Sequence, residues 1–292
     1  MTRFYAIVLV LLGSVLAAAS AVQAGMLVTD YSPQRNDRFA NSPLFIGNSP
    51  QVPSTLDFSG VGQTSGGQWV TMISPQYFLS AAHYAPAAND TVTFYHGNDA
   101  SPQYAYSYKI ASWSRQMSLN GSPSDLYIGK LSTPIDTSEI ATYHVLGTNS
   151  GAAYVGQQIL AYGAPNRVGI GTIRSIFDLN YSGNSTWLMR YDYSATTPDS
   201  AYLETGDSGA PSFENVNGHL VLAGIHYVHG NDYTGQYYSG DSFIPYYLPQ
   251  LLAGEGGTQV VVEAVPEPST LALLLIGGIG LIGYAWRRKR AA

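Results

Sequence analysis

Short apolar stretches separated by turn-forming residues fill the middle of the chain, from about residue 54 to residue 254. Each is five to eleven residues long, and Gly, Asn and Pro lie between them. Spacing of this kind favours an all-β barrel or sandwich. The stretches are 68–73, 77–81, 91–95, 104–112, 126–131, 157–162, 168–178, 187–193, 210–214, 219–229 and 236–244.

The regions on either side of these strands have different patterns. Pro245–Ala253 is the best helix candidate, because proline lies in its first turn and Gly254 follows as a stop signal. We expect a linker over residues 255–264. Residues 25–53 are polar and rich in Pro and Asn, which indicates a leader or pro-segment ahead of a domain at 54–254.

Residues 1–24 have the pattern of a secretory signal peptide. Arg3 precedes an apolar stretch that begins with Ile7–Leu12, and small residues follow up to Ala24. This predicts cleavage before Gly25. An uncleaved anchor is the alternative, although the apolar stretch is short for a membrane span.

The last residues, 265–292, have three parts in a fixed order. The box Val265–Pro–Glu–Pro–Ser–Thr270 comes first, the apolar run Leu271–Trp286 follows, and the basic cluster Arg287–Arg290 comes last. The apolar run would form roughly 24 Å of helix, and snorkelling basic side chains make up the difference to a hydrocarbon core of roughly 30 Å. The basic cluster should stay cytoplasmic, which leaves the main domain outside the inner membrane.

This C-terminal arrangement resembles the PEP-CTERM sorting signal of Gram-negative bacteria. The resemblance implies that the tail is held in the inner membrane and is then cut near the box by a dedicated sorting enzyme. The protein would end in the cell envelope or outside the cell. A permanent C-terminal anchor is the alternative.

Composition and charge exclude several classes of function. Apolar residues make up 45% of the chain and charged residues 11%, and the net charge is −6. Five of the 13 basic residues lie in the two terminal segments, so the domain lacks the basic face that nucleic-acid binding needs. Cysteine is absent, which excludes disulfides, thiol catalysis and structural Cys–zinc sites.

Three segments carry the residues of a hydrolytic site. An apolar strand ends in His83, Asp125 begins a half-buried strand, and Ser208 lies in the sequence Gly206–Asp–Ser–Gly209. A serine hydroxyl is a weak nucleophile that needs a base within hydrogen-bond reach and an acid to orient that base. These segments predict Ser208 as nucleophile, His83 as base and Asp125 as acid.

The glycines around the serine suit an oxyanion hole. They permit a tight loop in which the amides of Gly206 and Ser208 converge on a developing negative charge, a contribution worth about 2.7–4 kcal/mol per donor in other enzymes. The order His, Asp, Ser differs from that of subtilisins and α/β-hydrolases, and the Gly-x-Ser-x-Gly elbow of the latter is missing around Ser208.

Together these motifs resemble the chymotrypsin-fold (trypsin-like) serine proteases over about residues 57–252. The resemblance implies two six-stranded antiparallel β-barrels, at about 54–140 and 150–245, with the site between them and a C-terminal helix. It also implies a wide separation between the histidine and the acid, which favours Asp125 over Asp90. The other acids of the first barrel, Asp99 and Asp136, lie in polar, turn-like stretches.

The chain departs from this family in two ways. The family's disulfides are missing, and we expect packing by the 23 tyrosines to replace them. In the family, the acid before the nucleophile, here Asp207, pairs with a freed N-terminus that begins Ile-Val-Gly-Gly. That motif is absent before the first barrel, so we expect Asp207 to organise the loop as a hydrogen-bond acceptor, with pairing to a cation left open.

Substrate preference rests on three candidate residues. Tyr202 stands where trypsins carry an acid, so cleavage after Arg or Lys is not predicted. Gly224–Ile–His–Tyr227 resembles a motif of bacterial glutamyl endopeptidases, which makes His226 a candidate for binding an acidic side chain and Tyr227 a neighbouring contact. The favoured alternative for His226 is packing in the pocket wall.

No metal site or cofactor is predicted, although calcium in the loops at Asn98–Asp99 or Asn231–Asp232 stays open. The sequence therefore predicts an exported serine endopeptidase that acts on proteins or peptides through an acyl-enzyme intermediate. Two alternatives remain. One is a catalytically silent binding or matrix protein of the same fold, and the other is an esterase that uses the same triad.

Overall fold

The structure is a computed structural model, and the parts of the chain that it describes exclude both predicted targeting segments. The signal peptide at 1–24 and the sorting signal at 265–292 lie outside the described residues. Within the described part, no helix is both long and apolar enough to cross a bilayer. The described residues are 25–48, 56–147, 151–254 and 256–263.

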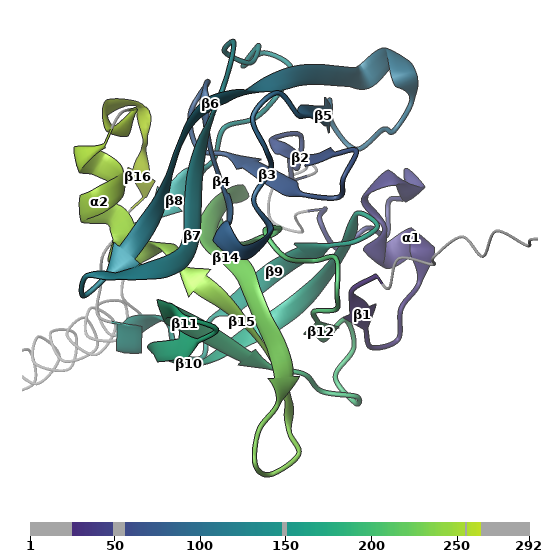
Figure 1. Cartoon of the computed structure of the whole chain (residues 1–292). Coiled ribbons are helices and arrows are strands. Elements are labelled where there is room, and N and C mark those ends of the chain that lie inside the picture. Colours follow the sequence, from purple (N-terminus) through teal and green to yellow (C-terminus); the bar gives the residue numbers. More distant parts are fainter. Residues whose placement is uncertain (1–24, 49–55, 148–150, 255, 264–292) are drawn as a thin grey trace, which may run out of the picture.

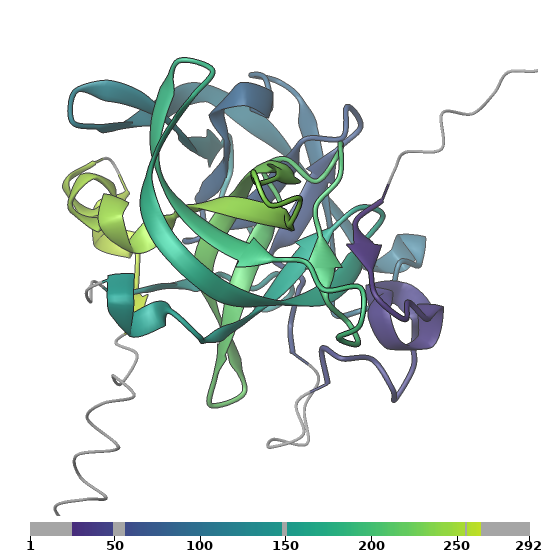
Figure 2. The same cartoon turned by 90° about the horizontal axis from the view of Figure 1, so that it is seen from below.

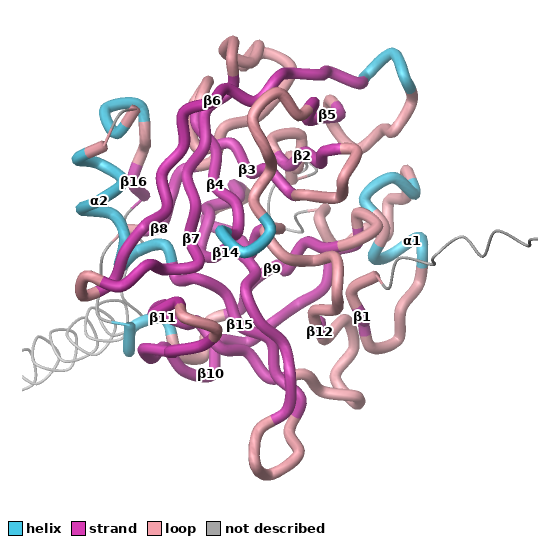
Figure 3. The backbone as a smooth tube through the Cα atoms, viewed as in Figure 1, coloured by secondary structure: helices cyan, strands magenta, loops and turns pink. Residues whose placement is uncertain are grey.

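Two antiparallel β-barrels make up most of the described chain (Figure 1). The strands of the first barrel close in the order β2-β3-β4-β7-β6-β5. Those of the second follow the order β13-β9-β10-β11-β15-β14, and pairing of β13 with β14 closes the ring. In Figure 3 the strands form these two groups, with the helical turns around them. The predicted all-β fold with two six-stranded barrels is confirmed.

The strand bounds follow. The first barrel comprises β2 (Val61–Thr64), β3 (Trp69–Met72), β4 (Tyr77–Ala81), β5 (Thr91–Tyr95), β6 (Ala105–Leu119) and β7 (Ser122–Leu131). The second comprises β9 (Gln158–Gly163), β10 (Arg167–Tyr181), β11 (Asn184–Asp192), β13 (Pro211–Val216), β14 (His219–Asn231) and β15 (Tyr237–Phe243).

Each of the eleven apolar stretches contains a strand, but the hairpins are longer than the pattern indicated. The stretch predicted to end at residue 112 continues as β6 to Leu119. The reason is the turn chemistry. Asn120–Gly121, Ser182–Gly183 and Asn217–Gly218 all have positive φ at both positions, the geometry that two-residue hairpin turns require. These turns set the ends of the hairpins.

The predicted C-terminal helix is present in two pieces. A 3₁₀ turn covers Ile244–Tyr247, and α2 (Leu248–Ala253) continues from it. The buried side chain of Leu251 lies on α2, and Arg115 of β6 donates through Nη2 to the carbonyl of Gln250 at 2.7 Å. The helix of the second half of the chain is thereby held against the first barrel.

Residues after the helix join the second sheet and do not form a free linker. β16 (Val262–Glu263) pairs parallel with β8 (His144–Leu146), which in turn pairs parallel with β14. Val260 is buried, and the amide of Gly147 donates to the carbonyl of Glu263 at 2.7 Å. The linker expected at 255–264 therefore contains a short edge strand, which the sequence pattern did not indicate because it is only two residues long.

Residues 25–48, expected as a leader, pack against both barrels. Strand β1 (Leu27–Val28) pairs with β12 (Ala201–Tyr202), and α1 (Pro33–Asn36) follows. The buried guanidinium of Arg38 donates from Nη2 to the carbonyl of Tyr95 in the first barrel, at 2.8 Å, and from Nη1 to the hydroxyl of Tyr162 in the second, at 3.3 Å. Figures 1 and 2 both show α1 on the side of the molecule opposite α2.

Aromatic packing between the barrels occupies the core of this cysteine-free protein. The ring of Trp69 meets that of Tyr162 edge-on at 5.6 Å, and Phe58 contacts both Tyr162 and Phe213. The hydroxyl of Tyr143 donates to the carbonyl of Asp57 and accepts from the amide of Gly60, so a buried tyrosine keeps its polar tip satisfied. Packing of this kind buries large areas without cross-links.

One buried carboxyl in the second barrel makes stability depend on pH. Glu214 of β13 is only 4% exposed, its Oε1 has no hydrogen-bond partner among the described residues, and burial raises its pKa from 4.5 to about 7. Because the folded-state pKa lies above the unfolded one, the stability that this group contributes is present below pH 4.5 and is lost as pH rises through 7. We expect Glu214→Gln to raise the free energy of unfolding at pH 8 by up to about 3 kcal/mol, measured by urea titration.

At pH 4.5 the Glu214→Gln protein and the wild type should unfold at similar urea concentrations. The matched control is Asp30→Asn, which removes an exposed carboxylate and should leave the pH dependence of stability unchanged. Equal stability of the wild type and Glu214→Gln at pH 8 would show that the buried carboxylate does not lower the free energy of unfolding, which would contradict the prediction.

Candidate active site

The structure brings His83, Asp125 and Ser208 into one hydrogen-bonded row. His83 Nδ1 lies 2.8 Å from Asp125 Oδ2, and His83 Nε2 lies 2.8 Å from Ser208 Oγ. The main-chain amide of His83 also donates to Asp125 Oδ1 at 2.9 Å. Both carboxylate oxygens therefore hold the same histidine, which fixes the proton on Nδ1 and leaves Nε2 as the acceptor that faces the serine.

Strand register explains how the first two residues meet. Ala81 at the end of β4 pairs with Leu126 of β7, so the residues just beyond this pair, His83 and Asp125, lie side by side. Asp125 is completely buried, and burial raises its pKa while the hydrogen bond and charge of His83 partly lower it. Its main-chain amide donates to Thr186 Oγ1 of β11 at 2.9 Å, which ties the acid to the second barrel.

Ser208 lies on the loop between β12 and β13, pressed closely against β4. A side chain at Gly209 would place its Cβ 2.9 Å from Ser80 Oγ and 3.2 Å from the amide of Ala81, and Gly209 has φ +88°. Only glycine suits such a conformation and such an approach. The contact brings the nucleophile loop of the second barrel to the histidine end of β4.

Along this loop, amides that are hydrogen-bonded within the protein alternate with amides that are not. Asp207 N–H donates to the carbonyl of Glu204, and Gly209 N–H donates to that of His226. The amides of Gly206 and Ser208 have no acceptor among the described residues. Two donors of the predicted oxyanion hole are thus free to bind an external oxygen. Trp69 Nε1–H donates to the Gly206 carbonyl at 2.9 Å and so anchors the loop to β3.

Asp207, the predicted loop organiser, is completely buried beneath the nucleophile loop. Its Oδ1 accepts from the amide of Ala164 and its Oδ2 from that of Glu204, both at 2.7 Å. Within the described ranges it forms no ion pair with a Lys or Arg. Burial raises its pKa to about 6, although both amide hydrogen bonds and the charge of His226 oppose the rise.

A pocket of about 320 Å³ adjoins the triad on the second-barrel side. Its wall combines three tyrosine rings and two aliphatic side chains with the carboxylate of Glu204, the hydroxyl of Thr205 and the imidazole of His229. The residues that line it, besides His83 and Ser208, are Leu179, Tyr181, Glu204, Thr205, Tyr227, Val228, His229 and Tyr238.

Only one of the three specificity candidates lines this pocket. Tyr227 does, whereas Tyr202 is 7% exposed and packs beneath it, with His229 3.2 Å from its hydroxyl. His226 is 1% exposed, and both of its ring nitrogens have protein partners. The structure therefore does not support His226 as a ligand for an acidic substrate side chain, because no ring nitrogen faces the pocket.

Sequence analysis missed several residues that shape the site. Trp69 and Thr186 act through hydrogen bonds to the nucleophile loop and to the acid, and no local motif marks them. Glu204 and His229 can be read in the sequence, but the sequence does not show that the loop before Ser208 and strand β14 line the same pocket.

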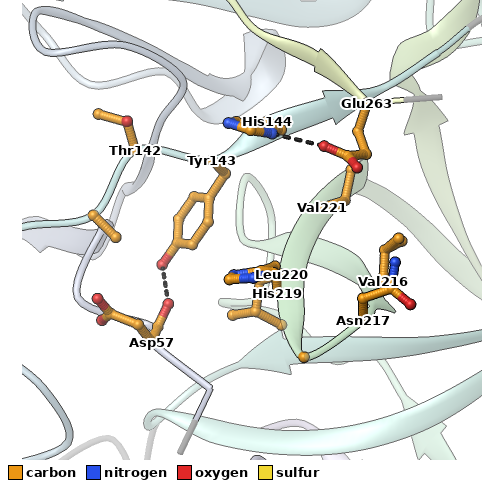
Figure 4. A pocket seen from close by; sticks show the side chains of 12 residues that line it. Asp57, Thr142, Tyr143, His144, Val216, Asn217, His219, Leu220, Val221 and Glu263 are labelled. Atoms are coloured by element: carbon orange, nitrogen blue, oxygen red, sulfur yellow. Dashed lines mark hydrogen bonds and ion pairs between the residues drawn. The ribbon is translucent and has the colours of Figure 1, made fainter. Parts of the chain in front are cut away.

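A second pocket, about 500 Å³, lies elsewhere and contains none of the predicted site residues (Figure 4). His144 and Glu263 form a 2.8 Å ion pair at its edge, and Asp57 and His219 lie farther along its wall. No group of three or more possible metal ligands occurs in the described part of the chain.

Comparison with known families gives two matches. The model described as Trypsin matches residues 45–249, which include His83, Asp125 and Ser208. The model described as the PEP-CTERM protein-sorting motif matches residues 264–290, and this motif indicates export sorting in Gram-negative bacteria. No significant match occurs among curated proteins.

Proposed function

Because the chain belongs to the trypsin family, we propose that it is an exported serine endopeptidase that cleaves peptide bonds through an acyl-enzyme intermediate on Ser208. The observation that carries the proposal is the continuous hydrogen-bonded row from Asp125 through His83 to Ser208, with both distances at 2.8 Å. An acid, a base and a hydroxyl in this order form the geometry of an activated serine.

In the proposed first step, Ser208 Oγ attacks the carbonyl carbon of the substrate while its proton passes to His83 Nε2. The buried carboxylate of Asp125 then stabilises the imidazolium through the bond to Nδ1. His83 returns the proton to the leaving amine, which breaks the carbon–nitrogen bond and leaves an ester on Ser208. A water molecule, deprotonated by the same histidine, hydrolyses this ester and frees the enzyme.

The unpaired amides of Gly206 and Ser208 would stabilise the negative oxygen that forms in both steps. The neighbouring amides, at Asp207 and Gly209, already hold the loop in place through their own hydrogen bonds. The amides of Gly206 and Ser208 therefore stay available for this role. Donors fixed before the reaction need no rearrangement when the charge develops, and this is why such holes contribute strongly to the rate.

The proposed setting is the cell envelope or the extracellular space after a sorting enzyme has processed the C-terminus. The match to the sorting motif at residues 264–290 supports it. The proposed substrates are proteins or peptides, whose side chains would enter the pocket beside Ser208.

A fluorophosphonate, which reacts with serine hydroxyls activated by a neighbouring base, separates this function from its alternatives. We expect one adduct per protein, mapped to Ser208 by mass spectrometry, with a matching loss of protein hydrolysis. A silent binding protein would form no adduct. An esterase would form the adduct but would hydrolyse esters and leave protein substrates intact.

A further inference from the structure

A second histidine–aspartate pair is buried directly behind the nucleophile loop. His226 Nδ1 lies 2.7 Å from Asp241 Oδ1, and His226 Nε2 lies 2.9 Å from the carbonyl oxygen of Tyr162. Both side chains are at most 1% exposed. Neither partner of the ring is a donor when Asp241 is ionised, and a neutral imidazole has only one N–H. The two contacts are therefore satisfied together by an imidazolium.

The surroundings of this ring favour the charged form. Burial alone lowers the pKa of His226. The charge and hydrogen bond of Asp241 raise it by more than burial lowers it, and the charge of Asp207 adds to the rise, so the pKa is raised overall. The hydroxyl of Tyr191 on β11 also faces the pair, 3.4 Å from Asp241 Oδ1, and Glu204 lies on the far side of Asp207. Each of these groups is neutral or acidic.

The main chain of His226 is bonded directly to the loop that carries Ser208. Its amide donates to the carbonyl of Ala210 at 2.8 Å, and its carbonyl accepts from the amide of Gly209 at 3.1 Å. The position of His226 along β14 thus determines the position of the two residues that follow the nucleophile.

The side chain of His226 reaches the other end of the same loop through β9. The carbonyl of Tyr162 accepts from the imidazole, and two residues later the amide of Ala164 donates to Asp207 Oδ1. Gly163 lies between them, and a side chain there would place its Cβ 2.6 Å from Asp207 Oδ1. The imidazolium and the buried Asp207 carboxylate are therefore separated by no more than this short piece of backbone.

We propose that His226 is a positioning residue of the peptidase, and that its imidazolium, kept protonated by Asp241, holds the 206–210 loop in its productive shape. The inference rests on the proposed function. It gives Asp207 a charge partner inside the domain.

A pH profile distinguishes this role from simple packing. When His226 loses its proton at alkaline pH, it loses one of its two hydrogen bonds and the attraction to Asp207, so kcat should fall. Asp241→Asn keeps the size of the side chain but removes the charge that holds the proton. We expect the alkaline limb of the kcat profile to move to lower pH by at least about one unit, with KM changed less than about twofold.

The matched control is Glu263→Gln, which breaks the His144–Glu263 pair. That pair also joins a histidine to a carboxylate, at a distance of 2.8 Å, but it is half-exposed and lies at the pocket remote from the triad. We expect its pH profile to coincide with that of the wild type. An alkaline limb that stays in place in folded Asp241→Asn protein would overturn the proposal, since packing alone would change the melting temperature and not the limb.

The charge of His226 is measured independently by ¹⁵N NMR of the histidine side chains, with His226→Gln to assign the signal. We expect both ring nitrogens to remain protonated above pH 7, whereas a singly protonated ring at pH 6 would overturn the proposal even if Asp241→Asn does not fold. If the wild type shows no turnover that depends on Ser208, the peptidase function itself has failed, and the NMR titration still reports the charge state of the pair.

Discussion

Replacing Ser208 with alanine is expected to lower kcat for peptide hydrolysis by about 10⁶-fold, because the attacking oxygen is removed while every group that orients it stays in place. The change deletes one half-exposed atom, so the free energy of unfolding should remain within about 0.5 kcal/mol of the wild type. Initial rates on a quenched-fluorescence peptide, at enzyme concentrations checked by absorbance, measure the loss.

The matched control for this variant is Ser80→Ala, in which a buried serine beside the loop loses its bond to the carbonyl of Trp69. We expect Ser80→Ala to lower stability while it keeps most of the activity. Turnover by Ser208→Ala within tenfold of the wild-type rate would contradict the assigned nucleophile.

Asp125→Asn is expected to lower kcat about 10⁴-fold with little change in the fold. The amide oxygen of asparagine would still accept from the main chain of His83, but its NH₂ group would then face Nδ1. His83 would have to accept there and carry its proton on Nε2, where it cannot take the proton of Ser208. The rate of peptide hydrolysis and the melting temperature, measured on the same preparation, separate this effect from unfolding.

The control for the acid uses another carboxylate of the first barrel, one that the sequence analysis rejected. Asp136 is exposed, and its carboxylate accepts from the amide and hydroxyl of Ser138 within its own turn. Asp136→Asn should therefore leave kcat unchanged. If both asparagine variants retained the wild-type rate, the acid of the site would have to be sought elsewhere.

The hydrogen-bonded row could be predicted from sequence because each member has a local signal of its own. His83 follows directly after the apolar strand β4, Asp125 lies near the start of β7, and Ser208 lies between glycines whose positive φ the loop requires. The register that joins them, Ala81 opposite Leu126, is set by how the barrel closes. The sequence could suggest that closure only through family resemblance.

The role of His226 could not be predicted in the same way. Its motif indicated a pocket residue, but Asp241 on the next strand bonds to the ring and turns it inward. There the second ring nitrogen donates a hydrogen bond to the carbonyl of Tyr162. Periodicity predicts the face of a strand on which a side chain lies, but not the residue with which that side chain forms a hydrogen bond. The polar pattern of residues 25–53, predicted as a leader or pro-segment, did not indicate how residues 25–48 pack for a related reason, since Arg35 and Asn36 find a buried partner in Asp199.

The most direct measurement of the central claim is the trapping of the acyl-enzyme. The protein is mixed with a peptide p-nitrophenyl ester, quenched in acid within milliseconds, digested and examined by mass spectrometry. An acyl group on the hydroxyl of Ser208, absent from Ser208→Ala, is the expected result. Turnover of the ester that proceeds with the acyl group on another residue, or with no covalent adduct at any time point, would contradict the account.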